Sequence, residues 1–418
     1  MTKSDIKILC EKSKAASRKL ALLDARAKNK ALEGMAAALL KKKALILKAN
    51  LKDLKFAKSK GFSSALIDRL TLSSPRIDAM ARSLREIAGL KDPVGDVIET
   101  IKRPNGLLIK KVRVPIGAIL VIYESRPNVT SDCIGLCLKS GNSVILRGGK
   151  EAINSNIAIF EVLNAVALRR GMPDGAISIV RDTDRSVVND LLKESGVIDL
   201  VIPRGGESLI REVTAKSRIP VIKHYKGVCH TYVDAFADQD MAGNICFNAK
   251  VQRPGVCNAM ETLLVSESIA KDFLPWMIER FRRAGVEIRG CPKTKKIIGS
   301  GVKKALERDW YTEYLGLVLS VRVVKGIDEA IDHIMKYGSY HSDAIVTENK
   351  FNAAKFLARV DSACVYVNAS TRFTDGSEFG KGAEIGVSTD KIHARGPIGI
   401  EELTSYKYVI YGNGQVRK

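Results

Sequence analysis

Cys257 is the residue whose type and setting could most readily do covalent chemistry. It lies in the segment QRPGVCNAMETLLV, between a Pro-Gly step and an apolar run. A thiol at the N-terminus of a helix has a lowered pKa, and its thiolate is a nucleophile that forms acyl intermediates. A thiol in an apolar core is inert, and this is the commoner fate of a cysteine. The residues after Cys257 are compatible with a helix or a strand, so the local sequence leaves both interpretations open.

The cysteines as a set do not form a standard metal or disulfide pattern. The chain has eight of them and no C-x-x-C pair, and its first residues lack the apolar stretch of a secretory signal. We therefore expect reduced thiols in a cytoplasmic protein. A zinc cluster could be drawn from Cys229, His230, Cys246 and Cys257, but their spacing fits no standard site. We expect no metal, and we interpret Cys364, in SACVYVN, as a residue in the core of a strand.

Two glycine pairs that follow apolar runs could bind a nucleotide, although the chain has no G-x-G-x-x-G fingerprint. In VILRGGKEA, Arg147 and Lys150 flank a Gly-Gly turn, and two cations with close backbone approach suit the 2′-phosphate of NADP. In LVIPRGGESLI, Gly205, Gly206 and Ser208 stand where a helix begins, and the N–H groups of a helix N-terminus suit a pyrophosphate. Each turn alone is more typical of a simple βα connection. Together, in one sheet, they favour cofactor binding.

An α/β fold must position these residues. Residues 5–60 have apolar side chains at i, i+3 and i+4, which predicts amphipathic helices. The segment IKRPNGLLIKKVRV predicts a hairpin about its PNG turn. Apolar runs then alternate with helical patterns, from a buried strand at AILVIYE to a strand at IPVIKHY. This alternation predicts a doubly wound parallel sheet with ligands beyond the carboxyl ends of its strands.

The rest of the chain predicts a second α/β region and a terminal strand. The second region starts near residue 227 and has strands in ETLLVSES, VEIRGC and CVYVNAS. The last segment, EELTSYKYVIYGNG, predicts a strand that either pairs with the edge of a partner subunit or covers the hairpin.

Composition and charge restrict the class of protein. The chain of 418 residues is 45% hydrophobic and 27% charged, which is typical of a globular enzyme. Its longest apolar stretch, GAILVIY, is far too short to span a bilayer. The formal net charge is +22, and residues 1–60 hold 17 Lys/Arg against 5 Asp/Glu, so a nucleic-acid-binding protein is the alternative from another class. The lysines are interleaved with Ala and Leu at helical spacing, which favours solvated helix faces. We therefore expect no nucleic-acid or membrane partner. The positive charge would also attract an anionic substrate.

Long segments of the chain resemble the glutamyl phosphate reductase branch of the aldehyde dehydrogenase superfamily. The resemblance covers nearly the whole chain and is carried by VPIGAILVIYESRPNVTSD, SGNSVILRGGKEAINSN, QRPGVCNAMETLLV, VNASTRFTDGSEFGKGAEIGVST and KIHARGPIGIEELTSYKYVI. It implies an aldehyde dehydrogenase-like subunit of three parts. These are a doubly wound parallel-sheet cofactor-binding domain at 1–98 and 116–226, a second α/β catalytic domain at 227–400, and a β-hairpin oligomerisation arm at 99–115 and 401–418.

The resemblance also implies a reaction. The enzyme reduces L-glutamyl 5-phosphate with NADPH to L-glutamate 5-semialdehyde and phosphate, which is the second step of proline biosynthesis. Glutamate 5-kinase supplies the substrate. The resemblance also implies a homo-oligomer, either a dimer or a tetramer. By resemblance, Cys257 is the nucleophile that forms a thioester, Glu313 in TEYLG contacts the nicotinamide ribose, and Arg147 lies near the adenine ribose. The alternative within the same fold is oxidation of a free aldehyde with NAD.

Two positions depart from the superfamily pattern. The amide that stabilises the oxyanion is expected in YESRPNVT, where Asn128 is the candidate. The general-base glutamate of aldehyde oxidisers is replaced, in KHYKG, by His224. Oxidisers need that base to activate water for thioester hydrolysis, whereas a reductase must avoid such water, so the loss favours reduction. His224 is then either a spectator or a substrate contact. The cations expected to bind the anionic groups of the substrate are Lys250, Arg253 and Arg395.

Overall fold

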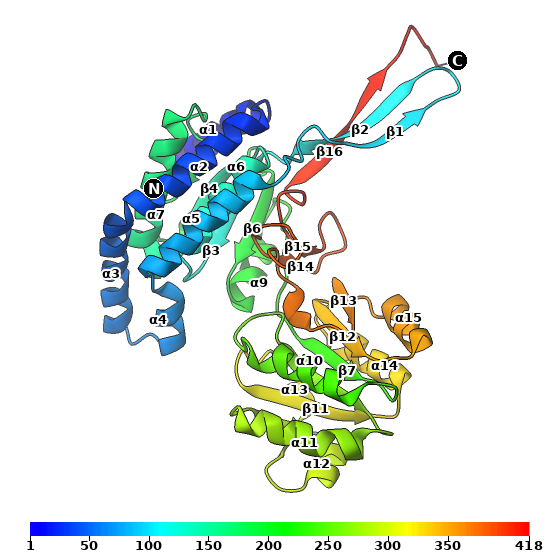
Figure 1. Cartoon of the computed structure of the whole chain (residues 1–418). Coiled ribbons are helices and arrows are strands. Elements are labelled where there is room, and N and C mark those ends of the chain that lie inside the picture. The colour runs from blue at the N-terminus through cyan, green and yellow to red at the C-terminus, as the bar shows by residue number, and fades with distance from the viewer. Residues whose placement is uncertain (418) are drawn as a thin grey trace. The chain divides into compact units, whose positions relative to one another are not determined.

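The computed structural model describes residues 1–417, which form two compact units (Figure 1). The first unit comprises residues 1–223, 380–386 and the segment from residue 398 onward. The second comprises residues 224–379 and 387–397. The chain therefore enters the second unit, leaves it and returns to it before it ends.

The bounds of the second compact unit differ from the expected catalytic domain, 227–400, in the last part of that range. Residues 380–386 and 398–400 belong to the first unit. A backbone hydrogen bond joins these two segments, since the N–H of Ile385 donates to the carbonyl of Ile398. Each returning segment is only a few residues long, so no periodic pattern in the sequence marks it.

The amino-terminal helices begin at side-chain caps that the sequence supplies. Thr2, Asp24 and Ser73 each accept a hydrogen bond from a backbone N–H in the first turn of the helix that follows. Most lysines of these helices are exposed, as predicted, but Lys28 is buried and its ammonium lies 2.8 Å from the carboxylate of Asp92. The helices are α1 (Lys3–Leu20), α2 (Ala25–Lys41), α3 (Lys43–Ser59), α4 (Ser64–Leu70) and α5 (Ser74–Gly89).

A four-stranded parallel sheet lies at the centre of the first unit. Its strands run in the order β5-β4-β3-β6, and β3 is buried along its whole length. Helices α1, α8 and α9 share one apolar core with the sheet, whereas α6 and α7 lie outside that core and also pack against the strands. The predicted doubly wound parallel sheet is thus confirmed. Its elements are β3 (Ala118–Tyr123), α6 (Asn128–Lys139), β4 (Ser143–Gly148), η1 (Lys150–Ala152), α7 (Ile153–Arg169), β5 (Ile177–Ile179), α8 (Arg185–Leu191), β6 (Leu200–Arg204) and α9 (Glu207–Lys216).

The strand expected at IPVIKHY is wrong. In this segment only Val221 forms a β-bridge, which pairs it with Val201. Pro220 has no N–H to donate, so the segment cannot form a regular ladder at its start.

The predicted hairpin is confirmed, and the last strand of the chain covers it. Strands β1 (Val97–Lys102), β2 (Leu108–Pro115) and β16 (Thr404–Tyr411) form an antiparallel sheet in the order β1-β2-β16, seen as a long ribbon in Figure 1. Of the two alternatives for the terminal strand, pairing with the hairpin of its own chain is therefore observed. We refer to these three strands as the arm.

A seven-stranded parallel sheet forms the second unit, in the order β10-β9-β11-β8-β7-β12-β13. One apolar core holds α10 and α11 against it, and another holds α14 and α15. No helix in the described part of the chain is long and apolar enough to cross a membrane. The elements are β7 (Cys229–Val233), α10 (Gln239–Val251), β8 (Met260–Ser266), α11 (Ala270–Arg283), β9 (Glu287–Gly290), α12 (Pro292–Ile298), β10 (Lys303–Lys304), α13 (Glu307–Trp310), β11 (Val318–Val324), α14 (Ile327–Tyr337), β12 (Ser342–Val346), α15 (Lys350–Arg359), β13 (Cys364–Val367), η2 (Thr371–Phe373), β14 (Val387–Ser388) and β15 (Gly396–Pro397).

His333, on α14, makes the second unit sensitive to acid. Its Nδ1 lies 3.1 Å from Nη1 of Arg322, and its ring packs against those of Trp310 and Tyr337. Burial, and then the charge of His230, lowers the pKa of His333 to about 2. Below pH of about 6.5 the unfolded chain binds a proton here that the folded chain does not bind. The free energy of unfolding should therefore fall by about 1.4 kcal/mol per pH unit from this group, between pH of about 6.5 and 2.

We expect a His333→Gln variant to lose less stability in acid than the unchanged protein. Between pH 7 and pH 5 the difference in lost unfolding free energy should be about 2 kcal/mol, because glutamine has no proton to bind. Urea unfolding at the two pH values measures it. Equal losses in both proteins would show that His333 is charged in the folded state.

Candidate active site

Cys257 lies in a turn of the second unit, after α10 and three residues before β8. The residues that follow it form a strand, so the thiol does not lie at a helix N-terminus and the helix-based argument for its reactivity is wrong. All eight cysteines lie within the described residues, and Cys257 is partly exposed while the other seven are buried. Cys257 is therefore the thiol that a substrate can reach.

The backbone of Gly227 packs directly against the Cys257 turn. A Cβ atom built on Gly227 would lie 1.8 Å from the carbonyl oxygen of Cys257, so no other residue fits there unless the turn moves. The N–H of Gly227 donates to Oε1 of Glu313 at 2.9 Å. Glu313, the expected contact of the nicotinamide ribose, thus binds the residue that abuts the thiol-bearing turn.

Two imidazoles lie beside the thiol. Sγ of Cys257 and one nitrogen each of His224 and His341 all lie within 4.8 Å of one another. His341 is fully buried, and its Nδ1 lies 2.9 Å from Oγ of Ser342. The buried thiol of Cys229 donates to the carbonyl of Cys257 at 3.2 Å. The arrangement places two imidazoles close enough to Cys257 to accept the proton of its thiol.

This cluster gathers at the amino ends of the parallel strands. Cys229 is the first residue of β7 and lies opposite Met260, the first residue of β8. His341 directly precedes β12, whose first residue, Ser342, lies opposite Cys364 of β13. Ligands of open α/β sheets ordinarily bind at the carboxyl ends of the strands. In this unit, the reactive thiol lies at the opposite end.

Arg372, in η2, is a cation near Cys257 that sequence reasoning missed. Its Nε donates to Oε1 of Gln252 at 2.9 Å, and Nη1 donates to the side-chain carbonyl of Asn258. Burial, and then the charge of Arg253, lowers the pKa of Arg372, and the negative charge of a Cys257 thiolate opposes that change. Arg253 is exposed. Lys250, Arg253 and Arg395 were the predicted substrate-binding cations. Of these, Arg253 lies near the thiol and has a side chain that is open to solvent.

Lys250, an expected substrate contact, is bonded within the protein. Its side chain is fully buried, and Nζ lies 2.6 Å from Oε2 of Glu261, which is also fully buried. Burial raises the pKa of Glu261 to about 7, and the attraction of Lys250 opposes this shift. Oε1 of Glu261 accepts the N–H of Leu315 at 3.3 Å. The pair therefore supports the loop that carries Glu313, and the role of Lys250 as a substrate contact stays a prediction.

Arg395 is likewise occupied within the protein. Its Nη1 donates to Oδ1 of Asp361 at 2.8 Å, and Nη2 donates to the Asp361 carbonyl at 2.6 Å. Lys391 pairs with the other oxygen of the same carboxylate. The guanidinium holds the β14–β15 loop to the end of α15, so the structure gives no support to its role as a substrate contact.

Asn128 begins α6 in the first unit. Its Nδ2 donates to Oδ2 of Asp132 at 3.0 Å, and burial raises the pKa of Asp132 to about 6. This bond orients the amide within the first unit. Its role toward an oxyanion stays a prediction.

The expected cofactor residues of the first unit follow neighbouring strand ends. Tyr123, the last residue of β3, lies opposite Gly148 of β4 and Arg204 of β6. Because the three strands are parallel, the two Gly-Gly turns lie at one edge of the sheet. The expectation that both turns follow strands of one sheet is confirmed.

The turn after β4 uses its two cations differently. Nη2 of Arg147 donates to the carbonyls of Thr183 and Asp184 at 2.8 and 3.3 Å, and Nη1 donates to that of Gly148 at 3.3 Å. Burial lowers the pKa of Arg147. Lys150 is exposed. Arg147 therefore joins two loops of the protein, and Lys150 is the cation of this turn that is open to solvent.

The turn after β6 presents the start of α9. The Gly206 N–H donates to Oε2 of Glu124 at 3.0 Å, and a Cβ on Gly205 would lie 2.4 Å from the same oxygen. Gly206 and Ser208 are exposed, and a Cβ on Gly206 would meet nothing within 4 Å. A pyrophosphate can therefore approach the backbone from the side of Gly206.

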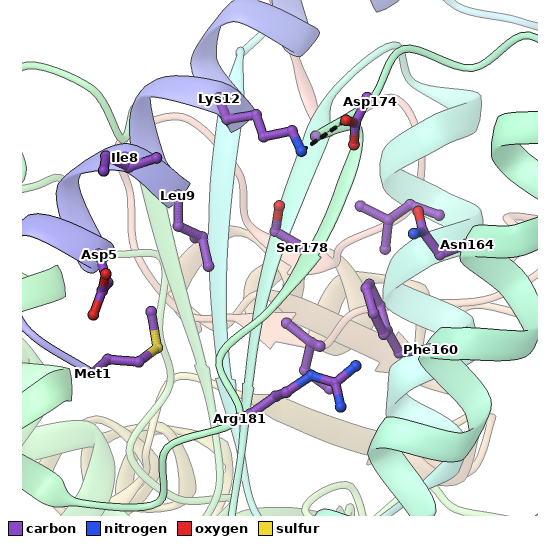
Figure 2. A pocket seen from close by; sticks show the side chains of 13 residues that line it. Met1, Asp5, Ile8, Leu9, Lys12, Phe160, Asn164, Asp174, Ser178 and Arg181 are labelled. Atoms are coloured by element: carbon purple, nitrogen blue, oxygen red, sulfur yellow. Dashed lines mark ion pairs between the residues drawn. The ribbon is translucent and has the colours of Figure 1, made fainter.

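A hollow of about 400 Å³ lies between α1, α7 and β5 of the first unit, and Figure 2 shows the side chains that line it. Lys12 and Asp174 face each other across its rim as an ion pair at 2.7 Å, and Arg181 and Asn164 also line it. None of the predicted site residues contributes to its lining. We therefore assign it no part in the chemistry.

Comparison with known proteins decides the family. The model of the Aldehyde dehydrogenase family matches residues 1–304. The chain belongs to the aldehyde dehydrogenase family. It is accordingly an oxidoreductase of that family, and the predicted fold class, with its two parallel sheets, is confirmed.

Relatives within the aldehyde dehydrogenase family match over the full length. The gamma-glutamyl phosphate reductase of Thermoanaerobacter pseudethanolicus is 58% identical over 414 residues, which are 99% of this chain and 100% of the relative. The crystal structure of gamma-glutamyl phosphate reductase from Thermotoga maritima has a TM-score of 0.96 at 48% identity and covers 99% and 100% of the two chains. An acetylating aldehyde dehydrogenase from Geobacillus thermoglucosidasius shares the fold at 18% identity, with a TM-score of 0.69 and coverage of 100% and 98%. The predicted resemblance is confirmed.

Proposed function

We propose that this protein reduces L-glutamyl 5-phosphate with NADPH to L-glutamate 5-semialdehyde and phosphate, the second step of proline biosynthesis, in the cytoplasm. The observation that carries the proposal is the accessible Cys257 thiol beside two imidazoles, in a chain of the aldehyde dehydrogenase family. The full-length relatives named gamma-glutamyl phosphate reductase support the choice of substrate.

Cys257 supplies the nucleophile. Its sulfur attacks the acyl carbon of the substrate, a C–S bond forms, and the C–O bond to phosphate breaks, so that inorganic phosphate leaves with the bonding electrons. The proton of the thiol passes to His224 or His341, which lie within reach of Sγ. The negative charge on the acyl oxygen is stabilised by the Cys257 N–H and by a side-chain amide, for which Asn128 is the candidate.

Arg253 and Arg372 bind the anionic groups of the substrate. The substrate carries a phosphate and a carboxylate, and a guanidinium binds either of them with two parallel hydrogen bonds. Arg253 is exposed, and Arg372 is held in place by Gln252 and Asn258. The two cations therefore offer one exposed contact and one contact held by hydrogen bonds close to the nucleophile.

We expect Arg372→Gln to raise the KM for the acyl phosphate about ten- to a hundredfold, since one charge-assisted contact contributes roughly 1.5–3 kcal/mol. Arg372→Lys should recover part of the loss, because it keeps the charge without the planar fork. Initial rates at varied acyl phosphate measure both variants. The KM for NADPH is the internal control, and a rise of both KM values together would mean that Arg372 only maintains the fold.

The first unit has a backbone edge that fits a dinucleotide. The turn at Gly205 and Gly206 admits a pyrophosphate, Ser208 offers a hydroxyl, and Lys150 offers a charge to the 2′-phosphate. Bound NADPH supplies the hydride that reduces the thioester. The sulfur of Cys257 then leaves the reduced carbon as a thiolate, which frees the aldehyde and regenerates the nucleophile.

We expect Lys150→Ala to weaken NADPH binding about ten- to a hundredfold and to change NADH binding little, because the loss of one phosphate contact costs roughly 1.5–3 kcal/mol. Arg147→Ala is the matched control. It removes a cation three residues away that is already bound to carbonyls, so the ratio of NADPH to NADH affinity should stay unchanged. Fluorescence titration with each dinucleotide measures the ratio. Equal losses for both cofactors in Lys150→Ala would exclude Lys150 as the phosphate contact.

The site also protects the thioester from water. Hydrolysis needs a positioned base, and aldehyde oxidisers use a glutamate where this chain has His224. Glu261, the carboxylate behind the Cys257 turn, is fully buried and bonded to Lys250, so it cannot activate water. We propose that His224 and His341 accept the proton of the Cys257 thiol but do not activate water, so that the acyl intermediate is reduced and not hydrolysed.

The reverse reaction tests the proposed function. Purified protein, NADP and L-glutamate 5-semialdehyde should form at most one NADPH per Cys257 until inorganic phosphate is added, because phosphate must release the acyl group from Cys257 before a second turnover. Continued formation of reduced cofactor without phosphate, with NAD preferred over NADP, would instead show oxidation of a free aldehyde.

The arm is the proposed oligomerisation element. Its two edge strands are β1 and β16, and they expose apolar side chains that include Val97, Ile98 and Ile410. Exposed edges and apolar side chains are features that partner subunits cover, so we propose a homo-oligomer, dimer or tetramer.

Glutamate 5-kinase, whose product is the substrate of this reaction, is the enzyme that we propose as its supplier.

A further inference from the structure

His224, Cys257 and His341 have the chemistry and the spacing of a metal site. Among residues 1–417 they are the one group of three or more His, Cys, Asp or Glu side chains whose ligand atoms converge, all within 4.8 Å of one another. One thiolate and two imidazoles form a ligand set that suits Zn²⁺. Around one tetrahedral Zn²⁺ these atoms would lie about 3.4–3.6 Å apart. Rotation of the side chains that moves the ligand atoms by about 1 Å would therefore complete the site.

The surrounding residues already orient one ligand. Nδ1 of His341 lies 2.9 Å from Oγ of Ser342, and that hydroxyl lies 2.6 Å from Oγ1 of Thr374. Ligating histidines in known metal sites are held by such a hydrogen bond on the ring nitrogen that does not bind the metal. We therefore infer that Nε2 of His341 is the ligand atom. Ser342 and Thr374 would then hold this one ligand in place.

The zinc cluster considered from the sequence is a different set and does not form. His230 has its Nδ1 2.8 Å from Oδ1 of Asp343, and both side chains are fully buried. Cys246 lies in the core on the inner face of α10. Cys257 is the only member common to the two sets. The sequence contains no fixed spacing that links residues 224, 257 and 341.

We propose that His224, Cys257 and His341 bind Zn²⁺ with three protein ligands, and that the bound metal inhibits the enzyme by occupying the thiolate. The fourth position is left for water or for a carboxylate of the substrate. The inhibitory consequence rests on the proposed function of Cys257, whereas the binding itself does not. Removal of the metal by a chelator restores the thiol, since no covalent bond to carbon is made.

The direct test uses the full chain, freed of metal by a chelator, and Zn²⁺ or Co²⁺ alone as the probe. Zn²⁺ is titrated in competition with a chromophoric chelator, and the Co²⁺ complex is read by its thiolate-to-metal charge-transfer band. We expect one ion per chain and the charge-transfer band. His224→Asn, His341→Asn and Cys257→Ser should each weaken Zn²⁺ binding by more than the roughly 10- to 100-fold that loss of a second-shell partner costs, and Cys257→Ser should abolish the band.

Cys246→Ala is the matched control, because it removes a buried thiol of the same unit that lies outside the group. It should keep the Zn²⁺ affinity and the band. A Co²⁺ complex without the band, or Zn²⁺ affinity equal in the unchanged protein and the three ligand variants, would overturn the proposal.

Alkylation separates this proposal from the proposed function. Zn²⁺ should slow the labelling of Cys257 by iodoacetamide, read by mass spectrometry without any substrate, and added chelator should restore it. Unchanged labelling at saturating Zn²⁺ would overturn the site even if the enzyme reduces its acyl phosphate. Protected labelling in a protein that does not reduce the acyl phosphate would support the site and refute the proposed function alone.

Discussion

Cys257→Ala is expected to abolish turnover and to leave NADPH affinity within about twofold of that of the unchanged protein. The thiol is the partly exposed cysteine of the chain, and the proposed chemistry has no step that proceeds without it. Removal of the nucleophile from an enzyme that forms an acyl intermediate costs on the order of 10⁶-fold in kcat. Turnover of acyl phosphate and fluorescence titration of the cofactor, on the same preparation, measure the two quantities.

Cys364→Ala is the control for this result. Cys364 is a buried cysteine of the same unit, at the start of β13. Its loss leaves a small cavity that should cost about 1 kcal/mol of stability without a large change in kcat. Retained turnover in Cys257→Ala would refute the nucleophile assignment, and a loss shared equally by both variants would point to damage of the fold.

Gly227→Ala is expected to lower kcat about a hundredfold with little change in global stability. The added Cβ would meet the carbonyl of Cys257 at 1.8 Å, so the turn that carries the thiol must shift by roughly 1 Å, and a misplacement of that size costs about 10²-fold in rate. The same shift strains the bond from the Gly227 N–H to Glu313. Steady-state kinetics, combined with thermal unfolding of the same sample, measures the effect.

Gly255→Ala is the matched control, two residues before the thiol. A Cβ at Gly255 would meet only the carbonyl of Leu315, at 3.7 Å, which is an ordinary contact distance. Its kcat should stay within about twofold of the starting value, because no atom has to move. If both glycine variants lost activity to the same degree, the close approach of Gly227 to Cys257 would not be the cause.

The first sheet could be predicted from the sequence because its strands are buried on both faces. AILVIY and SVILRG are continuous apolar runs, which is the pattern of a parallel strand between two layers of helices. The two Gly-Gly turns were predictable for the same reason, since each directly follows such a run. IPVIKHY is also rich in apolar residues but forms only one bridge, because Pro220 has no N–H to donate to a ladder.

The charges of the site were less predictable than its nucleophile. Lys250 and Arg395 were expected to bind substrate because the sequence gives their charge but not their partners, Glu261 and Asp361. Burial and pairing depend on the tertiary fold, and they engage both cations within the protein.

His341 and Arg372 were missed for a related reason. His341 and Arg372 lie more than 80 residues after Cys257 in the chain, next to β12 and in η2. No local sequence motif marks either residue. For His341, the signal that could have been used is a histidine directly before an apolar strand. That signal gains meaning only when β12 is known to lie next to β7.

The pairing of β16 with β2 has a consequence for synthesis of the chain on the ribosome. Thr404 lies opposite Pro115, and the ladder continues to Tyr411 opposite Leu108, so one edge of the hairpin stays unpaired until about 290 to 300 further residues have been translated. At bacterial or eukaryotic elongation rates of about 5–20 residues per second, this wait lasts roughly 15–60 s. During that time β2 presents a free strand edge, which is a template for pairing with other nascent chains. The half-exposed lysines at 110 and 111 on β2 place positive charge along that edge, and like charges on neighbouring nascent chains oppose their association until the terminal strand arrives.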